Sequence, residues 1–117
     1  MPVFDLLRRE PDIRSFSAGQ AIFIEGQEGD SMFAILDGEV EIRKGSRTLE
    51  VVSAGGVFGE MALIDQQPRS AAAIARTDCR VTAVGTKRFM MLVQQTPYFA
   101  LQIMQVLAER LRRNTVS

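Results

Sequence analysis

One segment, residues 55–71, brings together the residue types that bind an anion and a sugar. A glycine lets the backbone approach an anion closely, and free N–H groups at the start of a helical turn donate to it. Arg69 adds a forked, permanently charged donor. Glu60 cannot serve the same anion, because a carboxylate only accepts hydrogen bonds, so its natural partner is a donor such as a ribose hydroxyl. The segment is therefore expected to hold a sugar phosphate.

A second interpretation of the same segment needs no ligand. Glu60 and Arg69 would form a salt bridge, Pro68 would make a turn, and the apolar side chains between them would be core. An exposed ion pair contributes at most about 1 kcal/mol to folding, so its presence decides nothing. The residue types alone leave both interpretations open.

The composition indicates one ordinary globular domain, residues 1–117. The chain has 46% apolar and 24% charged residues, with 14 acidic residues against 14 basic ones. Zero net charge argues against a protein that grips DNA by neutralising phosphates, so no direct DNA binding is expected from this chain. A membrane span and a secretory leader are both absent from the pattern, which predicts a cytoplasmic protein without membrane contact.

The missing residue types exclude several chemistries. The chain has no histidine, the usual general base and a common metal ligand, and its single cysteine, Cys79, cannot form an internal disulfide or a multi-cysteine metal site. Cys79 is expected to be a small buried side chain in a strand. No second carboxylate stands opposite Glu60 in a recognisable motif. We therefore expect no enzyme, no metal and no cofactor.

The periodicity predicts a mainly β fold with flanking helices. Residues 1–11 contain a short helix that ends before Pro11, and residues 12–86 contain short apolar runs broken by glycine, which is typical of an antiparallel sandwich or barrel. Asp37-Gly38 predicts a two-residue hairpin turn between two of these strands. The expected strands are 13–16, 21–25, 31–36, 39–44, 48–53, 70–76 and 80–84.

Residues 87–113 carry a helical period. One helix is expected over 87–94 and a second to about Arg113, with Thr96 as its N-cap and Pro97 at its first position. The second helix carries two neighbouring apolar stripes, one through Ala100, Met104, Leu107 and Leu111, the other through Phe99, Ile103 and Val106. Two stripes suggest two contacts, one on the barrel and one on a partner.

The order of residues from Phe58 to Ala71 resembles the phosphate-binding cassette of the cyclic-nucleotide-binding domain family, of the type in catabolite activator protein and the regulatory subunit of protein kinase A. The motif over residues 19–30 and the Asp37-Gly38 turn also look like that family. The resemblance covers nearly the whole chain as a stand-alone domain. It implies an antiparallel β jelly-roll over residues 12–86, with the cassette at 55–71, one short N-terminal helix and two C-terminal helices.

The resemblance assigns the ribose to the first part of the cassette. Gly59 and Glu60 match positions that accept the ribose 2′-hydroxyl, Gly59 through its backbone and Glu60 through its carboxylate. Met61 and Ala62 match backbone positions near the same groups. These roles agree with the chemistry of the residues, since a carboxylate needs a donor.

The second part of the cassette is assigned to the cyclic phosphate. Arg69 matches the arginine that pairs with the phosphate, with the Ser70 hydroxyl and the Ala71 N–H beside it. A hydroxyl at position 70 does not settle whether the base is adenine or guanine. The implied ligand is cyclic AMP first, with cyclic GMP as the other possibility.

The last helix supplies the candidates that would cover the base: Arg110, Arg113, Asn114 and Thr115. The same cluster is also typical of a solvated, frayed helix end. Family members continue into an output module, for which this chain leaves no room, so a homodimer or an effector protein is expected to contact the C-terminal helix.

Two hypotheses from different classes follow. The first is a regulatory module that binds a cyclic nucleotide and shifts its C-terminal helices about a hinge near Gly85 and Thr86. The second is a jelly-roll interaction scaffold that binds no nucleotide and dimerises through the C-terminal helix. The intact Gly59, Glu60 and Arg69 count against the second.

Overall fold

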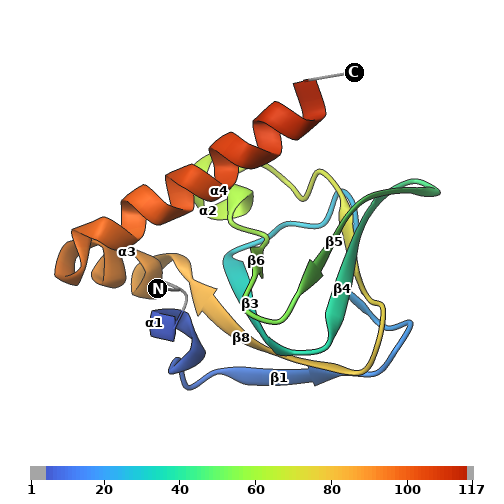
Figure 1. Cartoon of the computed structure of the whole chain (residues 1–117), viewed down its shortest axis with the longest axis horizontal. Coiled ribbons are helices and arrows are strands. Elements are labelled where there is room, and N and C mark those ends of the chain that lie inside the picture. Colours follow the sequence, from blue (N-terminus) through green and yellow to red (C-terminus); the bar gives the residue numbers. More distant parts are fainter. Residues whose placement is uncertain (1–4, 116–117) are drawn as a thin grey trace. The chain divides into compact units, whose positions relative to one another are not determined.

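A computed structural model describes residues 5–115, apart from the side chains of 114 and 115. Figure 1 shows short strands and helices in the order α1(Asp5–Arg8), β1(Ile13–Phe16), β2(Ala21–Phe23), β3(Ser31–Asp37), β4(Glu39–Lys44), β5(Arg47–Ser53), β6(Val57–Phe58), α2(Met61–Ile64), β7(Ala72–Ala75), β8(Cys79–Gly85), α3(Thr86–Gln95) and α4(Pro97–Thr115).

The strands form two antiparallel four-stranded sheets. One sheet has the order β1-β8-β3-β6 and the other β2-β7-β4-β5. Both sheets supply side chains to one core, which contains three phenylalanines with ring centroids 5.2 to 6.1 Å apart: Phe23, Phe33 and Phe58. Cys79 is part of this core on β8 and is 3% exposed, as expected. The mainly β fold with flanking helices is therefore confirmed.

The predicted hairpin at Asp37-Gly38 is wrong, although the two strand positions are right. β3 pairs with β6 and β8, whereas β4 pairs with β5 and β7, so the chain leaves one sheet for the other at this point. Gly38 has φ +90°, and a Cβ there would meet the Asp78 carbonyl and lie 2.5 Å from the Cβ of Cys79. Asp37-Gly38 does form a tight turn. A turn that carries the chain from one sheet to the other needs the same left-handed glycine as a hairpin turn, so the sequence could not distinguish the two.

The hairpin that does form joins β4 to β5, through Gly45 with φ +62°. The other expected strands agree with the structure to within two residues at each end. β6 was not predicted, because a two-residue strand has too little pattern to be recognised.

Contacts divide the chain into two compact units, residues 1–86 and 87–117. In the helical unit, the Phe89 and Phe99 rings meet edge to face, with centroids 5.6 Å apart. Of the two predicted stripes of α4, Phe99 and Ile103 are buried at 0% and 2%, whereas Met104 is 60% exposed. Among the described residues, no helix combines the length and hydropathy needed to cross a membrane.

Candidate functional site

Arg69 lies in the loop between α2 and β7, and its backbone ties that loop to the segment before β3. Its N–H donates to the carbonyl of Gln27 at 2.8 Å, and its carbonyl accepts from the N–H of Gly26 at 2.8 Å. Hydrogen bonds through both the N–H and the carbonyl of Arg69 hold this residue against residues 26–27. The backbone position from which the Arg69 side chain extends is therefore fixed.

The Arg69 guanidinium is buried, and the structure gives it two hydrogen bonds. Nη1 donates to the Gly59 carbonyl at 2.8 Å and Nη2 donates to the Ser31 carbonyl at 2.7 Å, while the residue is 7% exposed. Nε is buried and has no hydrogen-bond partner among the described residues. A guanidinium carries five N–H donors, so donors remain for another acceptor. This is the environment that an anionic ligand fits.

Aromatic rings form one wall of the site. The guanidinium carbon of Arg69 lies over the Phe23 ring, 4.0 Å from its centroid, and 5.9 Å from that of Phe33. Burial lowers the pKa of the Arg69 guanidinium, and the charges of Asp30 and Glu60 oppose that change. The contact with the ring face offsets part of the hydration that the buried cation loses. Arg69 stays charged, because the pKa of arginine starts far above neutrality.

The absence of a side chain at two glycines, Gly29 and Gly59, makes room for the Arg69 guanidinium. A Cβ at Gly29 would lie 2.5 Å from the guanidinium carbon of Arg69. A Cβ at Gly59 would lie 3.0 Å from Nη1, and Gly59 also has φ +79°, in the left-handed region that favours glycine. A side chain at Gly29 would displace the guanidinium, whereas one at Gly59 would press against Nη1 and strain the backbone.

Glu60 is buried beside this arginine, at 3% exposed. It occupies the N-cap position of α2, yet its own backbone is helical (φ −68°, ψ −24°) and its side chain makes no capping hydrogen bond. The carboxylate is therefore not used as a helix cap, a common role at this position. Because Glu60 and Arg69 are both buried, the exposed surface pair considered above is excluded.

The remaining predicted cassette residues differ in their exposure. Ala62 and Ala71 are buried at 6% and 8%, Met61 is 47% exposed, and the Ser70 side chain is exposed. The structure thus brings Gly59, Glu60 and Arg69 together, while the contacts of the other four with a ligand stay a prediction.

The candidates for a base cover lie on α4, in the helical unit. Arg110 is partly buried and Arg113 is exposed. The side chains of Asn114 and Thr115 lie outside the described residues. Their role stays a prediction.

Three neighbours of Arg69 were not assigned a role from the sequence: Phe23, Gly29 and the Ser31 carbonyl. Phe23 and Gly29 both belong to the motif over residues 19–30 that supported the resemblance. That motif was the available signal, but it lies far from the cassette in sequence. Only folding brings the two together.

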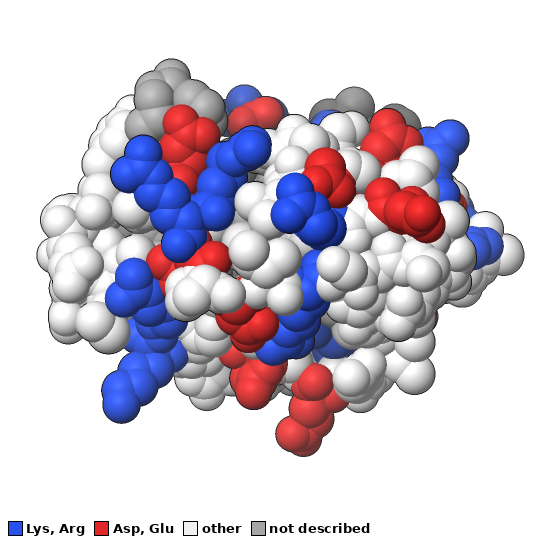
Figure 2. All heavy atoms as spheres, turned by 90° about the horizontal axis from the view of Figure 1, so that it is seen from below, with Lys and Arg blue, Asp and Glu red and all other residues white. Residues whose placement is uncertain are grey.

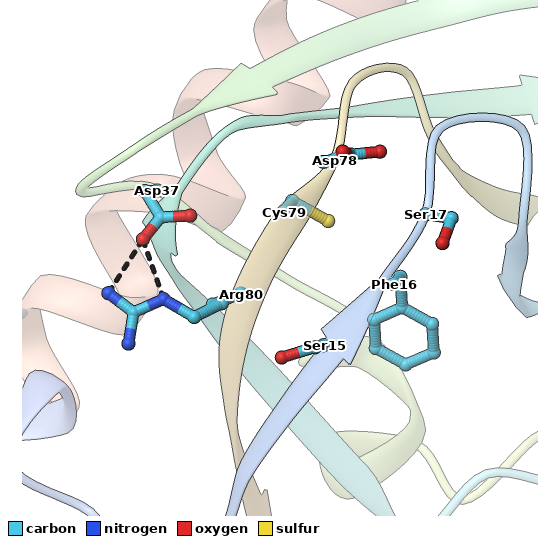
Figure 3. A pocket seen from close by; sticks show the side chains of 7 residues that line it. All are labelled: Ser15, Phe16, Ser17, Asp37, Asp78, Cys79 and Arg80. Carbon is cyan, nitrogen blue, oxygen red and sulfur yellow. Dashed lines mark hydrogen bonds and ion pairs between the residues drawn. The ribbon is translucent and has the colours of Figure 1, made fainter.

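A separate hollow of about 330 Å³ opens between β1, β3 and β8, as Figure 3 shows. Its lining residues are Ser15, Phe16, Ser17, Asp37, Asp78, Cys79 and Arg80. Arg80 donates to Asp37 from Nε at 2.8 Å, and Asp78 accepts from the N–H of Ala18 at 2.8 Å. Arg80 and Asp78 of the hollow thus have protein partners.

The described residues contain no cluster of histidine, cysteine, aspartate and glutamate that could hold a metal ion. On the face seen in Figure 2, basic and acidic side chains are interspersed, without a basic band. The features that single out the cassette are therefore a buried cation and a buried carboxylate beside each other.

Comparisons with known proteins point to one family. The family model described as "Cyclic nucleotide-binding domain" matches residues 13–96. The chain is 32% identical over 104 residues to the "Cyclic AMP receptor protein" of Thermus thermophilus, covering 85% of this chain and 48% of that protein. The chain thus spans about half the length of this relative, and less of others, such as 17% of a "cAMP-dependent protein kinase regulatory subunit" of Mycosarcoma maydis.

Solved structures share the fold. The "Crystal Structure of Thermus thermophilus Catabolite Activator Protein" has a TM-score of 0.86 and 30% identity, over 97% of this chain and 60% of that one. A structure described as "A cyclic-GMP-dependent signalling pathway regulates bacterial phytopathogenesis" has a TM-score of 0.81 and 27% identity, over 95% of this chain and 94% of that one.

Proposed function

The chain belongs to the cyclic nucleotide-binding domain family, as its sequence motif predicted, and we propose that it binds cyclic AMP as a regulatory module. One observation carries the proposal. A buried, charged guanidinium has unused N–H donors beside a buried carboxylate, at the cassette that defines the family. An anion can accept from the remaining donors of Arg69, and a hydroxyl of the same ligand can donate to Glu60.

The ligand would divide between these groups by charge. The cyclic phosphate carries the negative charge and accepts hydrogen bonds, so it goes to Arg69. The ribose 2′-hydroxyl donates, so it goes to Glu60. A nucleoside carries no phosphate charge, so it should bind more weakly than the cyclic diester.

The choice of cyclic AMP over cyclic GMP is the narrower part of the proposal. It is supported by the similarity to a protein named cyclic AMP receptor protein. A structural relative whose description names cyclic GMP makes that nucleotide the necessary comparison. Both nucleotides present the same phosphate and ribose to Arg69 and Glu60, so the difference must come from the base.

Regulation would act through the boundary between the two compact units, which lies after Thr86. We place the hinge near Gly85 and Thr86, where β8 ends and α3 begins. A ligand shifts such an equilibrium only by its difference in affinity for the two arrangements. The proposal therefore requires that cyclic nucleotide binding change the arrangement of α3 and α4, with the output passed to an effector protein and without catalysis by this chain.

Calorimetry and thermal unfolding with cyclic AMP and cyclic GMP test the binding. Arg69→Ala and Glu60→Ala should each weaken binding by about tenfold or more, since a hydrogen bond to a charged group contributes about 1.5 to 3 kcal/mol. Arg80→Ala is the matched control, because Arg80 is an exposed arginine paired with Asp37. For the wild type, ligand at a hundred times its dissociation constant should stabilise the fold by about 2.7 kcal/mol.

The outcome separates the two hypotheses. Binding by the wild type and by Arg80→Ala, with losses in the two cassette variants, supports the regulatory module. If the wild type binds neither nucleotide, the proposal fails and the interaction scaffold takes its place.

Dimerisation through α4 is proposed with both hypotheses, and one observation favours it. Met104 and Leu111, from the first predicted stripe, are 60% and 65% exposed. Large apolar side chains in a row on an exposed helix face commonly cover one another in a dimer. Sedimentation should show a dimer that Met104→Glu splits, and a monomer at high concentration of the wild type would remove this part of the proposal.

A further inference from the structure

Phe23 ends strand β2 and is 7% exposed, with its ring beneath the Arg69 guanidinium. The guanidinium carbon lies 4.0 Å from the ring centroid, within the range of a cation–π contact. The ring belongs to the phenylalanine cluster of the core, and its centroid lies 6.1 Å from that of Phe33. The guanidinium therefore lies over a ring that the core itself holds in place.

The contact with this ring, unlike the other contacts of Arg69, leaves the N–H donors of the guanidinium available. The carbonyls of Gly59 and Ser31 each accept one N–H of the guanidinium. A contact with an aromatic face accepts none of the five donors in a localised hydrogen bond, yet it restrains where the planar group lies. Two carbonyls and one ring thus restrain the cation from three directions, and Nε keeps its donor.

We propose that Phe23 is a positioning residue for the ligand site, which holds the Arg69 guanidinium in the orientation that the cyclic phosphate needs. The inference rests on the proposed function for its ligand and adds a positioning residue from outside the cassette. A side chain held before binding loses less conformational entropy when the ligand arrives, which strengthens binding without a direct contact.

A purely structural role for Phe23 makes a different prediction. If the ring only fills core volume, an aliphatic side chain of similar size should leave Arg69 and ligand affinity as they were. If the ring holds the cation, the aromatic face is what matters. The two roles are therefore separated by side chains that keep volume and lose the ring.

Four variants make this comparison. Phe23→Leu removes the ring, and Phe23→Tyr keeps it. Phe23→Met, whose unbranched side chain adapts to irregular gaps, gives the same comparison if the leucine variant does not fold. Phe16→Leu is the control, because Phe16 packs against the same core cluster from β1, whereas the described rings that face the Arg69 guanidinium are those of Phe23 and Phe33.

The first measurement needs no ligand. The ¹H–¹⁵N signal of the Arg69 Nε–H reports the mobility of the guanidinium directly. We expect an order parameter of about 0.85 in the wild type, Phe23→Tyr and Phe16→Leu, and a value below about 0.6 in Phe23→Leu. Equal order parameters in all four proteins would overturn the inference.

The second measurement is the affinity for cyclic AMP and cyclic GMP by calorimetry. Phe23→Leu should bind about 5- to 30-fold more weakly, which is about 1 to 2 kcal/mol at 1.4 kcal/mol per tenfold, with Phe23→Tyr close to the wild type. Unchanged or tighter binding by Phe23→Leu would overturn the inference while the proposed function stands. A wild type that binds neither nucleotide overturns the proposed function, and the Nε–H signal still decides whether Phe23 orients Arg69.

Discussion

A single methyl group at Gly29 should displace Arg69. The φ of Gly29 lies outside the left-handed region, so alanine is allowed by the backbone, but its Cβ would lie 2.5 Å from the guanidinium carbon. Non-bonded carbons sit about 3.5 to 4.0 Å apart, so the guanidinium must move by about 1 Å or more. Its hydrogen bonds of 2.8 and 2.7 Å cannot both survive that shift.

The expected cost follows from these contacts. Leaving a buried carbonyl without its donor costs about 1 to 3 kcal/mol, and replacing glycine by alanine returns about 0.4 to 1 kcal/mol by restricting the unfolded chain. The free energy of unfolding should therefore fall by about 1 to 2 kcal/mol, or Tm by about 4 to 8 °C. Affinity for the cyclic nucleotide should fall by about tenfold or more, because Arg69 no longer meets the phosphate.

Thermal unfolding and calorimetry of Gly29→Ala test this, with Gly85→Ala as the stability control. A Cβ at Gly85 would lie 3.6 Å from the nearest atom, the Asp30 carbonyl, which is an ordinary contact. The control should be as stable as the wild type or slightly more so. If Gly29→Ala matched the wild type in both stability and affinity, the close approach of Gly29 to Arg69 would contribute neither to folding nor to ligand binding, and the expected displacement of Arg69 would be refuted.

Three further outcomes are expected. Gly38→Ala should destabilise the fold by more than about 3 kcal/mol in urea unfolding, because its φ is +90° and its Cβ would meet the Asp78 carbonyl; a loss below about 1 kcal/mol would contradict this. Burial raises the pKa of the Cys79 thiol above 9.0, so the folded state keeps its proton longer than the unfolded state. The stability from this thiol should be present below about pH 9 and fall as pH rises through the folded pKa, and Cys79→Ala should show a shallower fall in urea unfolding across this range. Arg80→Ala should cost less than about 1 kcal/mol in thermal unfolding, since its pair with Asp37 is about half exposed, and a loss above 2 kcal/mol would refute that estimate.

Local patterns were sufficient for most of the secondary structure. Strands β1, β4 and β8 and both long helices lie where alternation and helical period predicted them, because these patterns involve residues close in sequence. Local patterns could not predict that β3 pairs with β8 instead of β4, because β8 is far from β3 in sequence. Asp37-Gly38 reports a turn, and whether the strands on either side pair depends on which sheets enclose the core.

The sequence by itself determined which residue types the cassette offers: a permanent cation at Arg69, a hydrogen-bond acceptor at Glu60, and a glycine whose backbone can approach an anion at Gly59. These residues are near one another in the chain, so their order is a readable signal. Only the tertiary structure decided that Arg69 would be buried over Phe23 and fitted against Gly29. These contacts cross 46 residues of chain for Phe23 and 40 for Gly29. They exist because two sheets close over one aromatic core that no local pattern describes.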